Sequence, residues 1–255
     1  MRIANSIVQV CVLATVALLA ATSLPAQQPA PHPRHVITEI QTLPSGSTSF
    51  EDLIRAHVLP AVKEAGSEIY TWRTASLGNP NRYAIISPVE SMSQFDSPAG
   101  WTVALGEGRT ARFFSQIRPH IDSVQRTLEV ERHDLSHFPT GKFNMRRALL
   151  VEATARPGMQ PQMEKMLSEQ VVPAFTEMKR GFASNQVSIG GNPNQWAFLI
   201  QIDKFADLEG GPFLLRHWGP EKYATWSQEV AGYLTHEVQY SIVELMPELS
   251  VMPQE

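Results

Sequence analysis

The apolar positions of this chain follow two periodicities, and the same order of periodicities occurs twice. In residues 35–42, and again in residues 148–155, apolar and polar residues alternate as in a half-buried strand. Each run is followed by a turn and then by apolar residues at three-and-four spacing, which predicts an amphipathic helix. Pro60 and Pro173 predict a kink or an end in the last turns of these helices.

Each helix is followed by a predicted hairpin, a second helical region and a last strand. The hairpin strands are expected at 69–77 and 82–89, and at 182–189 and 195–202. The helical regions are expected at about 99–121 and about 212–235, and the last strands at 126–133 and 239–245. The order β-α-β-β-α-β is typical of a ferredoxin-like unit, in which helices cover one face of an antiparallel sheet.

A direct repeat links the two halves. Gly78-Asn79-Pro80-Asn81 returns 113 positions later as Gly191-Asn192-Pro193-Asn194. Without a gap, residues 34–84 and 147–197 are identical at 13 of 51 positions. We therefore predict an α+β protein of two tandem ferredoxin-like repeats, 34–136 and 147–249. Because each sheet keeps one uncovered face, we expect the two sheets to pair as an intramolecular barrel around a cavity.

The N-terminal residues have the pattern of a secretory signal. An apolar run from Ile7 to Ala21 follows Met1-Arg2, and small residues lead to Ala26. We expect a signal peptide at 1–26, a proline-rich linker at 27–33, and a secreted or periplasmic protein without a stable membrane anchor after cleavage; an uncleaved anchor is the alternative. Cys11 is the only cysteine, so the mature chain would have neither disulfides nor a cysteine nucleophile.

Charge and motifs exclude several classes of function. The 255 residues carry 21 basic and 25 acidic side chains, and no basic block is present that would hold nucleic acid. No Walker loop, G-x-G-x-x-G, G-x-S-x-G or H-E-x-x-H sequence occurs, which argues against nucleotide-binding, serine-hydrolase and zincin functions. We expect no cofactor and no metal, and a small molecule as the partner, with homo-oligomerisation open.

The repeat resembles the dimeric α+β barrel superfamily, which includes antibiotic-biosynthesis-monooxygenase-like, EthD-like and NIPSNAP-like families. The likeness lies in the strand Val36-Ile37-Thr38-Glu39-Ile40, the helix end His57-Val58-Leu59-Pro60 and the hairpin after it, and it covers both copies. The resemblance implies a barrel with a cavity. Its members include cofactor-free oxygenases, isomerases, haem-handling proteins and proteins without known activity, so it implies no single reaction.

Glu39 and Glu152 occupy the same position in the two copies. Their neighbours suit the helix-covered face, which would turn both carboxylates into the barrel, where a raised pKa would suit a general base. The alternative is that they pair with Arg73, Arg82 or Arg126 across strands. Glu131 and Glu244 on the last strands raise the same question.

Further candidates are histidine and aromatic residues. His57, whose counterpart is Gln170, suits acid–base chemistry or a structural bond at a helix edge. A second set would stack on a planar ligand or pack the hairpins, namely Tyr70, Trp72, Arg73, Tyr83 and Trp196.

Two short histidine-containing segments are considered as metal or haem ligands. His133-Asp134-x-x-His137 contains metal-ligand types, but solvent-exposed polar residues are the favoured interpretation. Arg216-His217-Trp218 contains one histidine, which favours surface packing over haem ligation. The sequence therefore predicts an exported protein that binds a small apolar or aromatic molecule, as a cofactor-independent oxygenase or isomerase, or else a non-catalytic binding module.

Overall fold

The computed structural model describes residues 32–75, 77–140 and 145–253. The expected signal peptide, Cys11 and most of the expected linker lie outside these residues. Within the described part of the chain, no helix has the length and apolar character that crossing a bilayer requires.

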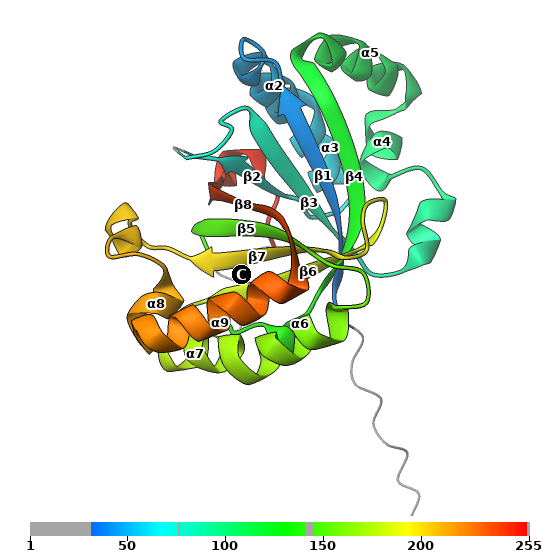
Figure 1. Cartoon of the computed structure of the whole chain (residues 1–255). Coiled ribbons are helices and arrows are strands. Elements are labelled where there is room, and N and C mark those ends of the chain that lie inside the picture. The colour runs from blue at the N-terminus through cyan, green and yellow to red at the C-terminus, as the bar shows by residue number, and fades with distance from the viewer. Residues whose placement is uncertain (1–31, 76, 141–144, 254–255) are drawn as a thin grey trace, which may run out of the picture. The chain divides into compact units, whose positions relative to one another are not determined.

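Eight antiparallel strands close into a barrel with the order β1-β3-β2-β8-β5-β7-β6-β4, which confirms the predicted α+β barrel (Figure 1). The first four strands are adjacent to one another, as are the last four, and the two sets join where β2 pairs with β8 and β4 with β6. The strands are β1 Arg34–Thr42, β2 Tyr70–Thr74, β3 Arg82–Val89, β4 Ile121–Glu131, β5 Arg147–Ala155, β6 Phe182–Ile189, β7 Gln195–Gln201 and β8 Leu234–Leu245.

The helices lie on the outside of the strands, where they bury the outward-facing apolar side chains (Figure 1). In the first half they are α2 Ser47–Leu53, the π-helical η1 Ile54–Val58, α3 Leu59–Glu64, α4 Gly100–Leu105 and α5 Glu107–Ile117. In the second half they are α6 Gln160–Met166, the π-helical η5 Leu167–Val171, α7 Val172–Glu177, α8 Phe213–Trp218 and α9 Pro220–Tyr233. Short 3₁₀ turns complete the described chain at η2 Met92–Asp96, η3 Arg118–His120, η4 His133–Leu135, η6 Phe205–Leu208 and η7 Pro247–Leu249.

The helical segment after the first strand of each half continues past its proline and does not end there. Pro60 lies in the first turn of α3, and Pro173 in the first turn of α7, each directly after a π-helical turn. Because proline has no N–H group, it cannot donate the usual bond to the carbonyl four residues earlier, and the wider turn accommodates that loss. The two π-helical turns, 54–58 and 167–171, lie 113 positions apart.

The second helical region of each half is interrupted at a glycine. Gly106 has φ +77° between α4 and α5, and Gly219 has φ +80° between α8 and α9. Only glycine adopts this conformation without strain, so each glycine ends one helix and lets the next begin in a new direction. The single helical regions predicted from the sequence are therefore helix pairs.

Two hydrophobic cores form where helices cover the strands. The core of the first half surrounds Phe50 and Tyr83, and the core of the second half surrounds Phe175, Phe182 and Trp196, all of them at most 2% exposed. Replacing one of the phenylalanines by alanine is expected to cost about 3–5 kcal/mol. These cores fix the outward faces of the strands, so the alternate residues must point into the barrel.

Candidate functional site

The interior of the barrel contains a cavity of about 320 Å³. Along each strand, every second residue points inward, so Ile37, Ile86, Leu150, Leu199 and Val243 form much of its apolar wall. A cavity of this size, largely apolar with a few polar groups, is typical of a binding site for a small organic molecule.

Arg82 holds together two carboxylates that come from the two halves of the chain. Its Nη1 and Nη2 donate to Glu152 at 2.6 and 2.7 Å, and Nη2 also donates to Glu39 Oε1 at 2.8 Å. All three side chains are partly buried and line the cavity. The bond to Glu152 is the main cause of the raised pKa of Arg82, so this guanidinium stays charged.

The sequence allowed two interpretations of Glu39 and Glu152, as inward-facing bases or as ion-pair partners of an arginine. The structure shows features of both. Both glutamates point into the barrel, as expected from the neighbours Val36 and Ile40, which are buried under the helices. Both also make the cross-strand pairing with Arg82. Each carboxylate therefore faces the cavity as one arm of an ion-pair network.

Glu129 on β4 is a further carboxyl group at the cavity, and it is 9% exposed. Burial is the largest cause that raises its pKa to about 7, and the charges of Glu39 and Glu152 raise it further. Thr127 Oγ1 donates to Glu129 Oε1 at 3.2 Å, which opposes that rise. Glu129 therefore exchanges a proton close to neutral pH, as a general base requires.

His35 and Glu131 line the cavity beside Glu129. His35 Nδ1 lies 3.9 Å from Glu131 Oε2, and His133 Nε2 lies 3.1 Å from Glu131 Oε1. Burial lowers the pKa of His35, although the charge of Glu131 acts in the opposite direction. His35 is therefore a neutral imidazole at pH 7.

Tyr70 and Trp72, two of the predicted ligand-binding aromatics, line the cavity. Trp72 is 4% exposed and belongs to an apolar cluster with Met145, Ala148 and Val243. The Tyr70 hydroxyl donates to Glu68 Oε2 at 3.0 Å, and burial together with this bond raises its pKa to about 12. Tyr70 is therefore a neutral phenol at physiological pH.

Tyr83 and Trp196 occupy the same position in the two helix-covered cores. Tyr83 borders the cavity, but its ring packs on Phe50 and its hydroxyl donates to Glu51 Oε1 at 2.8 Å. Trp196 is completely buried and its ring stacks with Phe198, and its indole Nε1 has no hydrogen-bond partner among the described residues.

His57 and Arg73 are placed away from the cavity lining. His57 lies on η1, where its ring meets the edge of Phe113 at 6.0 Å between centroids. Arg73 Nη1 donates to Glu51 at 3.2 Å, with 42% of the Arg73 side chain exposed. Of the eight predicted site residues, the structure therefore gathers Glu39, Glu152, Tyr70 and Trp72 around the cavity with their side chains inward.

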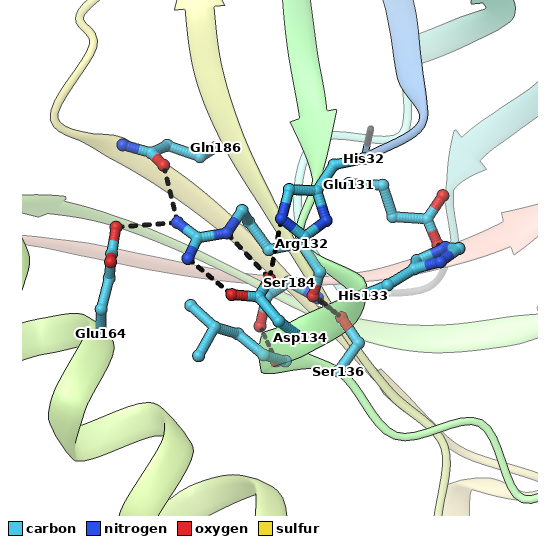
Figure 2. A network of polar contacts seen from close by, with 10 residues as sticks. His32, Glu131, Arg132, His133, Asp134, Ser136, Glu164, Ser184 and Gln186 are labelled. Carbon is cyan, nitrogen blue, oxygen red and sulfur yellow. Dashed lines mark hydrogen bonds and ion pairs between the residues drawn. The ribbon is translucent and has the colours of Figure 1, made fainter. Parts of the chain in front are cut away.

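His133 and Asp134 of His133-Asp134-x-x-His137 belong to a polar network at the end of β4 (Figure 2). Figure 2 shows Arg132 between Glu164 of α6, at 2.7 Å, and both oxygens of Asp134, at 2.9 and 2.8 Å. His137 instead lies 3.2 Å from Thr176 Oγ1. Among the described residues, no group of three or more His, Cys, Asp or Glu side chains is arranged to hold a metal ion.

His217 pairs with Glu177 at the surface, as its sequence context favoured. Its Nε2 lies 2.9 Å from Glu177 Oε2. The ring of the adjacent Trp218 packs against Trp226 and lies under the Lys222 ammonium.

The last strands of the two halves begin 113 positions apart, but further along they pair with β1 and β5 in registers that differ by one residue. Arg34 on β1 pairs with Val130, whereas its counterpart Arg147 on β5 pairs with Glu244. As a result Glu131 lines the cavity, while Glu244 accepts a bond from the Arg147 guanidinium and is absent from the lining. The question that the sequence raised for both residues is thus answered differently for each, because Glu131 faces the cavity and Glu244 does not line it.

Glu129 and His35 were not selected from the sequence. The gap-free alignment ends before β4, and the ladder between β4 and β6 shifts register between Leu128 and Glu129. Only the alternation Thr127, Glu129, Glu131 in the sequence indicated a polar inward face there.

Comparison with known proteins finds similarity in the fold. No protein-family model matches the chain. No curated protein matches it either. An anthrone oxidase-like protein aligns over 84% of this chain and 92% of its own, with a TM-score of 0.58 and 10% identity. A candidate monooxygenase from Lactobacillus acidophilus NCFM aligns over 88% of this chain and 100% of its own, with a TM-score of 0.53 and 8% identity.

A third structure, a candidate monooxygenase from Fusobacterium nucleatum, has a TM-score of 0.54 at 11% identity and covers 84% of this chain and 93% of its own. At such identities the likeness concerns the fold alone. The chain shares the α+β barrel fold of these proteins.

Proposed function

We propose that the barrel cavity binds a small, mainly apolar or aromatic molecule, and that Glu129 removes a proton from it. The observation that carries this proposal is a carboxyl group, 9% exposed, with a pKa of about 7, at the edge of a largely apolar cavity of about 320 Å³. A base with such a pKa combines a useful ionised fraction with a strong tendency to take a proton at neutral pH.

Glu39 and Glu152 are less suited to be the base. Both accept strong hydrogen bonds from Arg82, and taking a proton would require each of them to give up part of that ion pair. Their part in the proposal is to hold the guanidinium in place and to set the negative potential that raises the pKa of Glu129.

Proton removal from carbon or from a phenol begins two cofactor-independent reactions. In an isomerase, the proton returns from Glu129 to a different carbon, and no other reagent is needed. In an oxygenase, the anion reduces O₂, so that a methylene compound R₂CH₂ and O₂ give R₂C=O and H₂O. The names of the similar structures, candidate monooxygenases and an anthrone oxidase-like protein, support the second reaction as the one to test first.

A non-catalytic binding module is the second candidate function. Part of the barrel is filled by an apolar cluster around Trp72, Met145 and Val243, and Arg82 already has carboxylate partners inside the protein. Both features are what a purely structural interior would have. The free second oxygen of Glu129, which receives no hydrogen bond from the described residues, favours the catalytic candidate.

We also propose that the halves are tandem ferredoxin-like copies. Several elements of the second half begin 113 positions after their counterparts in the first half, namely β5 after β1, α6 after α2, η5 after η1 and α9 after α5. The helix-ending glycines Gly106 and Gly219 have the same spacing. Each half also has the same strand order, β4-β1-β3-β2 and β8-β5-β7-β6.

Export to the periplasm or to the medium remains our proposal from the pattern of residues 1–26.

Two carbon acids test the reaction. With 2-tetralone in D₂O at pH 8, proton NMR measures exchange of the α-protons; with anthrone, an oxygen electrode measures consumption of O₂. We expect the protein to accelerate at least one of these reactions, and Glu129→Gln to lower that rate by at least 100-fold. Glu248→Gln is the matched control, because Glu248 is an exposed carboxylate outside the cavity lining.

Each result has a defined meaning. Loss of rate in Glu129→Gln alone supports the base assignment. An unchanged rate in Glu129→Gln contradicts it. Binding of both probes, measured by quenching of tryptophan fluorescence, without any exchange or O₂ consumption would favour the binding module.

A further inference from the structure

The ionisable groups around the cavity are strongly unbalanced in charge. Of the described residues that line it, four bear carboxyl groups and one bears a guanidinium, while His35 is neutral at pH 7. The carboxyl groups belong to Glu39, Glu129, Glu131 and Glu152, and the guanidinium belongs to Arg82. The lining therefore carries a net charge of −2 when Glu129 is protonated and −3 when it is ionised.

Neighbouring side chains do not neutralise this charge. Lysine is absent from the described lining, and Arg82 is the only arginine in it. His133 reaches Glu131 from outside the lining, and 52% of its side chain is exposed to solvent. A ligand inside the cavity thus meets a negative potential in surroundings of low dielectric constant, where a charge interacts more strongly than in water.

Glu129 is the carboxyl group with free capacity for a ligand. Its Oε1 accepts a hydrogen bond from Thr127, and its Oε2 receives none from the described residues, although the side chain is 9% exposed. Oε2 is not fully buried, and Glu129 lines the cavity, so a donor supplied by a ligand there would give this oxygen a hydrogen bond. The other inward carboxylates have partners, since Glu39 and Glu152 bind Arg82, and Glu131 binds His133.

The walls near these carboxylates suit the remainder of a cation. Trp72 and Tyr70 line the same cavity, together with aliphatic side chains from β1, β3, β5 and β7. Aromatic faces attract ammonium groups, and aliphatic walls bury the apolar part of such a molecule. An inorganic cation is a poorer match, because the described residues form no metal-binding group.

The charge also bears on proton transfer. Removing a proton from a neutral molecule creates an anion next to three other carboxylates, and this repulsion raises the barrier. Removing it from a cation leaves a neutral product, and Glu129 loses its own charge in the same step. The base chemistry that we propose is thus easiest with a substrate that enters with a positive charge.

From these observations we infer that the cavity selects an organic cation, namely a protonated or quaternary amine on a compact apolar or aromatic body, with its charge at Glu129. This inference rests on the proposed function and names the class of molecule for the same site. Anions of similar shape are excluded by the same carboxylates.

Binding of such a cation is coupled to the proton on Glu129. The titratable or charged groups that line the cavity with Glu129 are His35 and Glu39 on β1, Tyr70 on β2, Arg82 and Tyr83 on β3, Glu131 on β4 and Glu152 on β5. The described cavity residues of β6, β7 and β8 carry no ionisable side chain. The cation favours the ionised form of Glu129, so its affinity rises from pH 6 to pH 8 while a primary amine stays protonated.

Three naphthalene derivatives of similar size test this inference on the purified protein by isothermal titration calorimetry at pH 8. They are 1-naphthylmethylamine, a cation; 1-naphthalenemethanol, which is neutral; and 1-naphthoate, an anion. We expect the amine to bind at least tenfold more tightly than the alcohol, and the alcohol more tightly than the naphthoate. In Glu129→Gln we expect the preference for the amine to fall at least fivefold, whereas Glu248→Gln keeps it.

The outcomes separate this inference from the proposed function. If the alcohol or the naphthoate binds at least as tightly as the amine, the cation inference is overturned while binding in the cavity stands. If none of the three binds, binding in the cavity is itself contradicted, and the inference with it. Far-UV circular dichroism and thermal melting show that Glu129→Gln is folded; an amine preference that survives in this folded variant also overturns the inference.

Discussion

Arg82 Nη1 lies 2.6 Å from Glu152 Oε2, although the two residues are 70 positions apart and belong to different halves of the chain. The same guanidinium also binds Glu39, which occupies in the first half the position that Glu152 occupies in the second. One arginine thus links a symmetric pair of carboxylates inside the barrel. The counterpart of Arg82 is Gln195, so this link is made once.

Arg82→Gln is expected to destabilise the fold, because it leaves Glu39 and Glu152 facing one cavity without a counterion. Removing one partner of a fully buried ion pair costs roughly 3–5 kcal/mol, and these side chains are 14–32% exposed, so we expect about 2 kcal/mol. Urea denaturation at pH 7 measures the loss. Neutralising both glutamates in the same variant should recover most of it; equal stability of wild type and Arg82→Gln would contradict the counterion role.

Glu129→Gln is expected to change how stability depends on pH. The folded-state pKa of Glu129 is about 7, above its ordinary value of 4.5, so the folded state holds this proton more tightly than the unfolded state. This contribution is complete below pH 4.5 and is lost as the pH rises through 7. The shift corresponds to about 3 kcal/mol.

Denaturation at pH 5 and at pH 8 tests this sign. Wild type should lose stability between the two values, and Glu129→Gln should lose about 2.5 kcal/mol less, since glutamine does not ionise. A parallel pH dependence in the two proteins would show that Glu129 titrates normally in the folded state.

The sequence was sufficient to predict the α+β barrel, because the signals that carry it are local. The alternation around Glu39 and Glu152, together with the shared Gly-Asn-Pro-Asn turn, placed both carboxylates on the inward face, where the structure has them. Alternation determines the face of a residue as long as the strand stays in register.

The rest of the site could not be predicted because it depends on register and on pairing between distant strands. The register shift between Leu128 and Glu129 determines which residues of β4 face the cavity. The partners of Arg82 come from β1 and β5, and composition offered Arg73 and Arg126 as equal choices. The raised pKa of Glu129 arises from burial and from two other strands, which no local pattern encodes.

His57→Ala tests a residue that the sequence proposed for catalysis and that the structure places outside the cavity. His57 lies on η1 beside Phe113, and it is absent from the lining of the cavity. We expect the rates with 2-tetralone and anthrone, and the affinity for 1-naphthylmethylamine, to stay within twofold of wild type, with a loss of stability under about 1 kcal/mol. A tenfold fall in rate would return His57 to the candidate site.

Gly106→Ala and Gly108→Ala separate the effect of backbone conformation from the effect of space. A Cβ atom added at either glycine meets nothing within 4 Å. Gly106, however, has φ +77° and ψ 154°, a conformation that only glycine adopts readily, whereas Gly108 lies within α5. We expect Gly106→Ala to cost about 2 kcal/mol through strain and Gly108→Ala to add roughly 0.5–1 kcal/mol through helix propensity. Opposite shifts of the urea midpoint show that the glycine conformation maintains the break between α4 and α5; equal shifts would mean that the two helices can join.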